Sequence, residues 1–157
     1  MLSNITERKQ LENELNQLAF YDKLTGLPNR RMFMDNLQNL VKNSKRQNKT
    51  FAVFFMDLDD FKYINDSLGH EAGDELLKET GLRLKEIFRN TDMVARLGGD
   101  EFTVTIENIK DSDDVDLNYL AKKLLSQLSN KPITVQNRNR TVNTSIGIAK
   151  YPENGLD

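Results

Sequence analysis

The strongest constraint on the fold is a run of six apolar residues, FAVFFM at 51–56, which ends at Asp57. Its aromatic and β-branched residues favour a strand, and the lack of alternating polar residues indicates burial on both faces. We therefore expect a sheet flanked by helices. The run is far too short to cross a bilayer, and no signal peptide is visible. The sequence predicts a cytoplasmic protein, with any membrane tether lying in segments absent from this chain.

Composition narrows the function classes. The 157 residues amount to one domain that can bury a core, and contents of 38% hydrophobic and 29% charged residues are typical of a globular protein. The net charge of −2 argues against a nucleic-acid partner, which would require a basic surface. Cysteine is absent, which excludes disulfides, thiolate zinc sites and cysteine nucleophiles.

Residues 1–20 are predicted to form a separate N-terminal helix. Leu11, Leu15 and Leu18 recur at helical spacing among charged and amide residues, and no glycine or proline interrupts residues 5–20. The apolar stripe is narrow. It suits a coiled-coil linker between chains as well as it suits docking onto the chain's own domain.

After the turn residues Gly26 and Pro28, helices and strands follow one another. We expect a helix from Asn29 to about 44, the strand 51–57, a short helix 59–69 closed by Gly69, a helix 70–89, strands 92–97 and 102–107, a helix 111–129, and a hairpin of 132–136 and 140–151 over NRN at 137–139. A strand–helix–strand crossover followed by a hairpin gives a mixed sheet. The fold class is therefore α+β and ferredoxin-like.

The glycine turn Gly98–Gly99 is followed by Asp100 and Glu101, which form a candidate metal site. If the strand before the glycines pairs with the 51–57 strand, both acids come close to Asp57. Three converging carboxylates repel one another unless a cation is bound, and their hard oxygens suit Mg²⁺, with Mn²⁺ as a substitute. Such sites transfer phosphoryl groups, and the glycines would let phosphates approach the backbone. Taken alone, the same pattern is an ordinary polar hairpin.

Three stretches match one known family in order and spacing: DKLTGLPNRR at 22–31, MDLDDFKYINDSLGHEAGDELL at 56–77 and GGDEF at 98–102. The chain resembles the GGDEF family of diguanylate cyclases over residues 21–157. The resemblance implies a palm-like α+β domain that binds one GTP. Two such domains meet as a homodimer, in which each 3′-hydroxyl attacks the other GTP's α-phosphate. The products are the second messenger cyclic di-GMP and two pyrophosphates.

The resemblance also implies roles for single residues around the glycine turn. Asp57, the backbone carbonyl of Leu58, Asp100 and Glu101 resemble the metal ligands. Asp100 also resembles the candidate base for the 3′-hydroxyl. Lys62 resembles the cation that steadies the phosphate charge of the transition state.

Asn65 and Asp74 resemble the residues that read guanine, with His70 nearby. Hydrogen-bonding chemistry also supports guanine as the base that Asp74 reads. A carboxylate only accepts hydrogen bonds, and guanine offers N1–H and an exocyclic amine as adjacent donors. Adenine offers an acceptor at that ring nitrogen, so GTP is favoured over ATP. Without the motif, Asp74 could simply complement a helix dipole, and Lys62, Asn65 and His70 could be solvent-facing helix residues.

Arg89 and Asp92 match the RxxD pair at which, in the family, the product inhibits the enzyme. The planar guanidinium of Arg89 could hold a phosphate or a guanine edge of cyclic di-GMP. Without a ligand, the same pair is a reasonable helix end and turn.

Two further resemblances bear on what the chain can do alone. The family's last helix, roughly ADxALYxAK, contacts the triphosphate, and YPENGLD at the end of this chain does not match it. We therefore expect weak activity from this chain. NITERKQLENEL resembles the junction after a PAS sensor, which suggests an upstream sensor domain. The alternative function is a non-catalytic receptor for GTP or cyclic di-GMP, which the intact GGDEF sequence disfavours.

Overall fold

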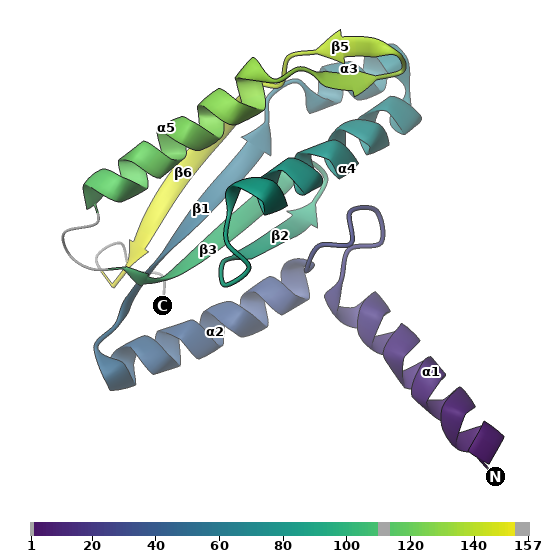
Figure 1. Cartoon of the computed structure of the whole chain (residues 1–157), viewed down its shortest axis with the longest axis vertical. Helices are drawn as coiled ribbons and strands as arrows, with labels where there is room; N and C mark the ends of the chain where they lie inside the picture. The colour runs from purple at the N-terminus through teal and green to yellow at the C-terminus, as the bar shows by residue number, and fades with distance from the viewer. Residues whose placement is uncertain (1, 110–113, 153–157) are drawn as a thin grey trace.

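The computed structural model describes residues 2–109 and 114–152, and Figure 1 shows a sheet with helices on both faces. The elements follow one another as α1 (Leu2–Phe20), α2 (Arg30–Gln47), β1 (Thr50–Leu58), α3 (Phe61–Leu68), α4 (His70–Ile87), β2 (Met93–Gly98), β3 (Glu101–Ile109), α5 (Asp114–Asn130), β4 (Ile133–Val135), β5 (Arg138–Arg140) and β6 (Thr144–Tyr151). The predicted helix signals are confirmed. The Asn29 side chain accepts a hydrogen bond from the Met32 amide at 3.1 Å, and α3 ends at Gly69 with a φ of 93°.

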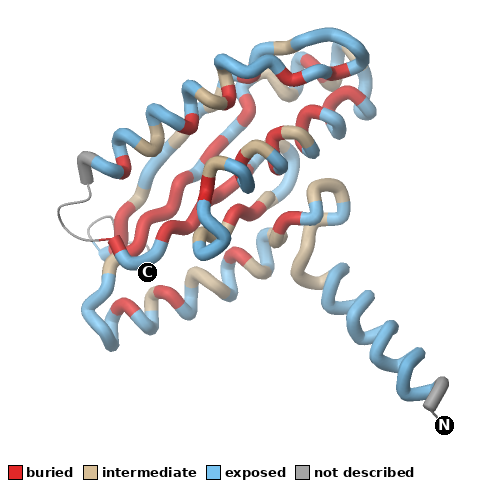
Figure 2. The backbone as a smooth tube through the Cα atoms, in the orientation of Figure 1, coloured by how far each residue is buried: buried red, intermediate tan, exposed pale blue. Residues whose placement is uncertain are grey.

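The buried strand predicted from FAVFFM lies inside the central sheet. The strand order is β2-β3-β1-β6, so β1 has a neighbour on each side. Residues 51–54 of β1 are at most 1% exposed, and the inner strands are mostly buried in Figure 2. Helix α2 covers one face of the sheet, and α4 and α5 cover the other (Figure 1). Burial on both faces is the physical reason that this strand lacks the polar alternation of a surface strand.

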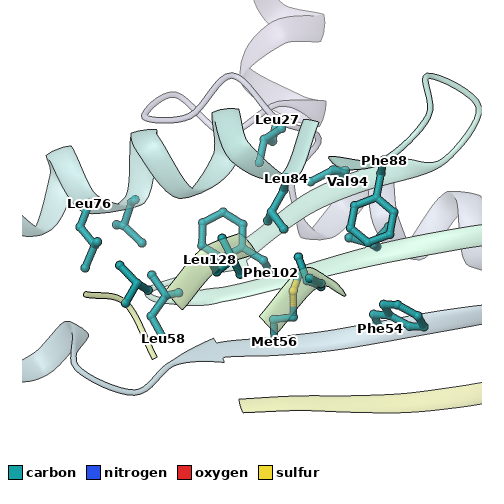
Figure 3. Close-up of a cluster of buried hydrophobic side chains, with 14 of the residues drawn as sticks. Leu27, Phe54, Met56, Leu58, Leu76, Leu84, Phe88, Val94, Phe102 and Leu128 are labelled. Carbon is teal, nitrogen blue, oxygen red and sulfur yellow. The ribbon is translucent and has the colours of Figure 1, made fainter. Parts of the chain in front are cut away.

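Alternate residues of β1 belong to two separate cores, because successive side chains of a strand point to opposite faces. Phe51 and Val53 pack with Phe33 and Leu40 of α2. The even-numbered residues face α4 and α5 instead. Figure 3 shows this larger core, which includes Leu27, Phe54, Met56, Leu58, Leu76, Leu84, Phe88, Val94, Phe102 and Leu128.

The α+β class is confirmed, but the sheet is paired differently from the expected mixed arrangement. Strand β3 lies between β1 and β2, and each neighbouring pair in the central sheet is antiparallel. The crossover from β1 through α3 and α4 to β2 therefore leaves room for a strand, as in a split β-α-β unit. Residues 102–106 of β3 are all buried, whereas β2 at the edge of the sheet is only partly buried.

The expected C-terminal hairpin is wrong in its turn and its partner. Strand β4 pairs with the short β5 across Gln136 and Asn137, whose φ angles are 49° and 63°. Two successive left-handed residues are typical of a type I′ hairpin turn, which matches the twist of the strands. The long strand β6 is separate and pairs with β1.

Helix α1 projects away from the rest of the molecule (Figure 1). Leu11, Leu15 and Leu18 are 60%, 65% and 57% exposed, so the apolar stripe does not dock onto the chain's own domain in this structure. The end of α1 is nevertheless held, because the side-chain Nδ2 of Asn29 donates to the Ala19 carbonyl at 3.0 Å. None of the helices in the described residues combines the length and apolar character needed to span a membrane.

The guanidinium of Arg83 in α4 holds the segment that follows α5. It donates to the carbonyls of Lys131 and Pro132, and the second of these hydrogen bonds measures 2.7 Å. Since these carbonyls lie just beyond the end of α5, few backbone donors are available to them. We predict that Arg83→Ala lowers the free energy of unfolding by about 1–3 kcal/mol, measured by urea denaturation.

Lys78→Ala, on the same helix but exposed, is the matched control and should change stability by less than about 0.5 kcal/mol. Equal effects of the two substitutions would contradict the capping role of Arg83.

Candidate functional site

The acids of the GGDEF stretch lie beside the end of the buried strand. In the register of the sheet, Asp57 of β1 is opposite Glu101 of β3 on one side and Ser145 of β6 on the other. Gly98 pairs with Glu101, so Gly99 and Asp100 form the turn of the β2–β3 hairpin. The structure thus brings Asp57 and Glu101 side by side and places Asp100 at the hairpin tip.

A cleft of about 390 Å³ opens on this part of the sheet. Its lining residues are Phe55, Met56, Asp57, Leu97, Glu101, Phe102, Ser145, Ile146 and Gly147. Phe55 contacts Phe33 of α2 edge to face, with ring centroids 6.4 Å apart, so the cleft continues the face that α2 covers. Asp57 and Glu101 are both exposed, which makes their carboxylates available to a ligand in the cleft.

The expected gathering of three carboxylates is only partly present. Within residues 2–109 and 114–152, no three acids or histidines lie close enough together to hold a metal ion by themselves. Asp100 does not line the cleft that Asp57 and Glu101 share. The donor set still fits Mg²⁺ bound with a nucleotide, because such ions use one or two carboxylates and take their remaining ligands from phosphates and water.

Gly98 and Gly99 leave the backbone of the hairpin open. Their φ angles are 143° and 48°, and a side chain on Gly98 would be strained in this conformation. A Cβ at either position would meet nothing within 4 Å. The two glycines are therefore required by the turn geometry, and they leave free space for a ligand at the backbone.

Arg96 fixes the hairpin to the loop that precedes α2. Its guanidinium donates to the Gly99 carbonyl at 3.0 and 2.8 Å and to the Asp22 carboxylate at 2.7 Å. The side chains of Arg96 and Asp22 are 13% and 17% exposed, so the ion pair is shielded from water. Arg96 also donates its backbone N–H to the Pro28 carbonyl at 2.9 Å. We call the Asp22–Arg96–Gly99 connection the hairpin clamp.

Asp22 is held in turn by its own loop. The Thr25 amide and hydroxyl donate to the Asp22 carboxylate at 2.9 and 2.8 Å, and the Gly26 amide donates to the Asp22 carbonyl at 2.8 Å. The sequence motifs alone predict no role for Asp22 or Arg96. A local signal was present, because aspartate three residues before threonine is typical of a side-chain-stabilised turn. That local signal does not indicate that Arg96 on the hairpin is the partner of Asp22.

The start of β6 holds the loop that follows β1. The Ser145 hydroxyl donates to the Asp59 carboxylate at 2.6 Å, and the Asp59 amide donates to the Asn143 carbonyl at 2.9 Å. Leu58, whose carbonyl is a candidate metal ligand, is paired with Thr144 in the ladder. The loop carrying this carbonyl is therefore fixed on both sides of Leu58.

The candidate guanine readers lie at the junction of α3 and α4. Asn65 of α3 is half-buried, and its side chain lies against Gly73 of α4, the residue before Asp74. Asp74 is exposed, as is His70, the first residue of α4. Lys62 is exposed in the first turn of α3. The structure thus brings Asn65 close to the start of α4, while none of these residues lines the cleft at Asp57.

Arg89 and Asp92 form a closed turn beside a second hollow of about 400 Å³. The Arg89 amide donates to the Asp92 carboxylate at 3.1 Å, and the Asp92 amide donates to the Arg89 carbonyl at 3.0 Å. The Asp92 side chain is 5% exposed and that of Arg89 is 72% exposed. Asp92 therefore stabilises the turn and also pairs with the Arg89 guanidinium, whose Nε lies 3.4 Å from the carboxylate, while the exposed part of the guanidinium remains accessible to an anion.

Glu101 forms an ion pair with Arg30 at the start of α2. The Arg30 guanidinium lies 3.4 Å from the Glu101 carboxylate, and both side chains are more than half exposed. An exposed ion pair of this kind contributes about 0–1 kcal/mol, so it holds Glu101 only weakly.

These features define a class of protein: an α+β domain whose central strand and glycine hairpin present acids to an open cleft. The family model described as "Diguanylate cyclase, GGDEF domain" matches residues 19–157. The chain therefore belongs to the GGDEF-domain family, and the resemblance noted in the sequence is confirmed.

Individual relatives agree with the family match. Bifunctional diguanylate cyclase/cyclic di-GMP phosphodiesterase MucR from Pseudomonas aeruginosa is 42% identical over 150 residues, which are 96% of this chain and 21% of MucR. Diguanylate cyclase TpbB from the same species is 40% identical over 149 residues, which are 93% of this chain and 33% of TpbB. The chain thus spans about a fifth of MucR and a third of TpbB.

The solved GGDEF domain of TpbB has a similar fold. Its structure matches this one with a TM-score of 0.78 at 37% identity, over 85% of this chain and 76% of that chain.

We predict that the hairpin clamp can be weakened by a charge-conserving change. Arg96→Lys keeps the positive charge but loses the planar fork that donates to Asp22 and Gly99 from opposite sides, so the free energy of unfolding should fall by about 1–3 kcal/mol in urea denaturation. Arg30→Lys, which alters only the exposed pair with Glu101, should change it by less than about 0.5 kcal/mol.

A double-mutant cycle with Asp22→Asn separates the clamp from general packing. The effects of Arg96→Lys and Asp22→Asn should be non-additive by about 0.5–3 kcal/mol. Strict additivity would mean that the two side chains do not act as a pair.

Proposed function

We propose that this chain is a diguanylate cyclase domain, which condenses two GTP molecules into cyclic di-GMP and two pyrophosphates. The observation that carries the proposal is the juxtaposition of Asp57 and Glu101 on an open cleft, at the hairpin of a chain that belongs to the GGDEF family. The names of MucR and TpbB support the same reaction class.

Each candidate site residue would have its own role in the reaction. Asp57, the Leu58 carbonyl and Glu101 would hold Mg²⁺, or Mn²⁺ in its place, together with the triphosphate. The bound ion would neutralise phosphate charge and favour the attacking oxygen as its alkoxide. Asp100, at the exposed hairpin tip, would accept the proton of the 3′-hydroxyl, and Lys62 would stabilise charge on the phosphates.

The reaction needs two domains. Each domain binds one GTP through Asn65 and Asp74, with His70 nearby, and the 3′-hydroxyl that attacks comes from the nucleotide on the other domain. A homodimer follows from this stoichiometry. The exposed Leu11, Leu15 and Leu18 of α1 suit a coiled coil that would bring two chains together.

We predict that Asp100→Asn abolishes turnover while sparing the fold. Removing a general base costs about 10²–10⁴-fold in rate, and asparagine keeps the shape of the hairpin turn. The measurement is chromatographic separation of nucleotides after incubation with GTP and Mg²⁺, together with a thermal melt of the variant. Asp116→Asn, an exposed acid on α5, is the control and should leave both readouts unchanged.

The same assay separates the proposal from its rival, a non-catalytic receptor for GTP or cyclic di-GMP. The accessible Arg89 beside the second hollow is the observation that favours a receptor role. Nucleotide binding without any product from the unaltered domain would favour the receptor. Undiminished turnover by Asp100→Asn would rule out the role of Asp100 as base.

We predict that Arg89→Ala relieves inhibition by cyclic di-GMP. The substitution removes a guanidinium that can pair with a phosphate, whereas Asp92 is engaged mainly in its own turn. The loss should raise the concentration of cyclic di-GMP for half inhibition by roughly 10-fold or more, measured as initial rate against added product.

Arg46→Ala, an exposed arginine in the last turn of α2, serves as the control for general loss of charge. If cyclic di-GMP inhibits Arg89→Ala as strongly as the unaltered domain, the inhibitory site is misassigned.

A further inference from the structure

Gly73 in the first turns of α4 faces the side chain of Asn65 at unusually short range. A Cβ atom on Gly73 would lie 1.8 Å from Asn65 Oδ1, 2.8 Å from Asn65 Cγ and 3.2 Å from Cε2 of Phe61. A side chain at position 73 would therefore require Asn65 to move. The carboxamide of Asn65 therefore occupies the volume that a side chain at position 73 would fill.

The backbone does not explain the glycine. Gly73 lies within a regular helix, and its φ is outside the left-handed range that favours glycine elsewhere in this chain. Glycine also destabilises a helix interior relative to alanine. The structure thus leaves one physical reason for this residue, which is close approach by Asn65.

Hydrogen bonding does not fix Asn65 either. Its Oδ1 is buried and has no hydrogen-bond partner in the described part of the chain. The orientation of the carboxamide is therefore determined by shape, between the Phe61 ring and the bare backbone at Gly73. A buried acceptor without a donor is unfavourable and calls for a physical explanation.

We propose that Gly73 is a positioning residue for nucleotide recognition, acting through Asn65. The inference rests on the proposed function, because it gives Asn65 the role of reading guanine. The neighbouring residues Gly73 and Asp74 then contribute to base recognition in two ways. Asp74 supplies a carboxylate, and Gly73 leaves the space that orients the side chain of Asn65. Any larger residue at position 73 rotates Asn65 away and leaves Asp74 alone.

The test compares two glycine-to-alanine changes in the same buried face of α4. Gly73→Ala should displace Asn65, whereas the atom nearest to a Cβ on Gly81 is Cδ1 of Leu27 at 3.3 Å, the flexible end of a side chain, and Thr25 Cβ at 3.6 Å is an ordinary contact. The probes are 3′-deoxy-GTP and 3′-deoxy-ITP, which lack the attacking hydroxyl and so report binding without turnover. Calorimetric titration gives their dissociation constants.

We predict that Gly73→Ala weakens binding of 3′-deoxy-GTP by roughly 5- to 100-fold, the range expected for loss of one buried hydrogen-bonding group. The preference for 3′-deoxy-GTP over 3′-deoxy-ITP, which lacks the exocyclic amine, should be retained, because the Asp74 carboxylate that accepts from this amine stays in place. Gly81→Ala should change neither quantity. The side-chain amide signal of Asn65 in nuclear magnetic resonance should shift in Gly73→Ala and not in Gly81→Ala, even without nucleotide.

A double-mutant cycle distinguishes positioning from general packing. In an Asn65→Ala background, Gly73→Ala should cause no further loss of binding, because the residue through which it acts is gone. A full additional loss in that background would overturn the proposal, as would unchanged binding of 3′-deoxy-GTP by Gly73→Ala itself. Failure of the unaltered chain to bind 3′-deoxy-GTP would instead overturn the proposed function, and the nucleotide role of Gly73 with it.

Discussion

The register of β1 within the sheet is the constraint on which the site depends. Side chains along a strand alternate between faces, so a slip of one residue would exchange the two cores and move Asp57 to the opposite face. The alternation of Phe51 and Val53 toward α2, with Phe54 and other even-numbered residues toward α4 and α5, opposes such a slip. The same apolar packing that stabilises the fold therefore determines where the acid at the strand end meets Glu101.

Local signals predicted much of the fold, and long-range packing determined the rest. The cap at Asn29 and the end of α3 at Gly69 follow from residues within one turn of the chain. The position of β3 between β1 and β2 depends on which strand gains most from burial, and a single sequence does not specify that choice. The turn at Gln136–Asn137 was missed because glutamine is a weak signal for a left-handed residue.

The candidate site was likewise predicted only in part from the sequence. Asp57 and Glu101 do come together, but not through the expected strand: Asp57 lies near the end of β1, and Glu101 begins β3, which pairs with β1 in place of the strand before the glycines. The pairing of Asp22 with Arg96 joins residues 74 positions apart, and the contact of Asn65 with Gly73 depends on how two helices cross. Such contacts organise a site without carrying its chemistry, so residue type alone does not reveal them.

The weak pair between Arg30 and Glu101 has a consequence for charge at the cleft. A divalent ion held by the Glu101 carboxylate, as proposed above, would compete with this guanidinium. The apparent affinity of the cleft for the ion would then include this internal competitor, which salt weakens because the pair is exposed. The displaced arginine would remain at the start of α2, where it would add positive potential for a polyanion that arrives with the ion.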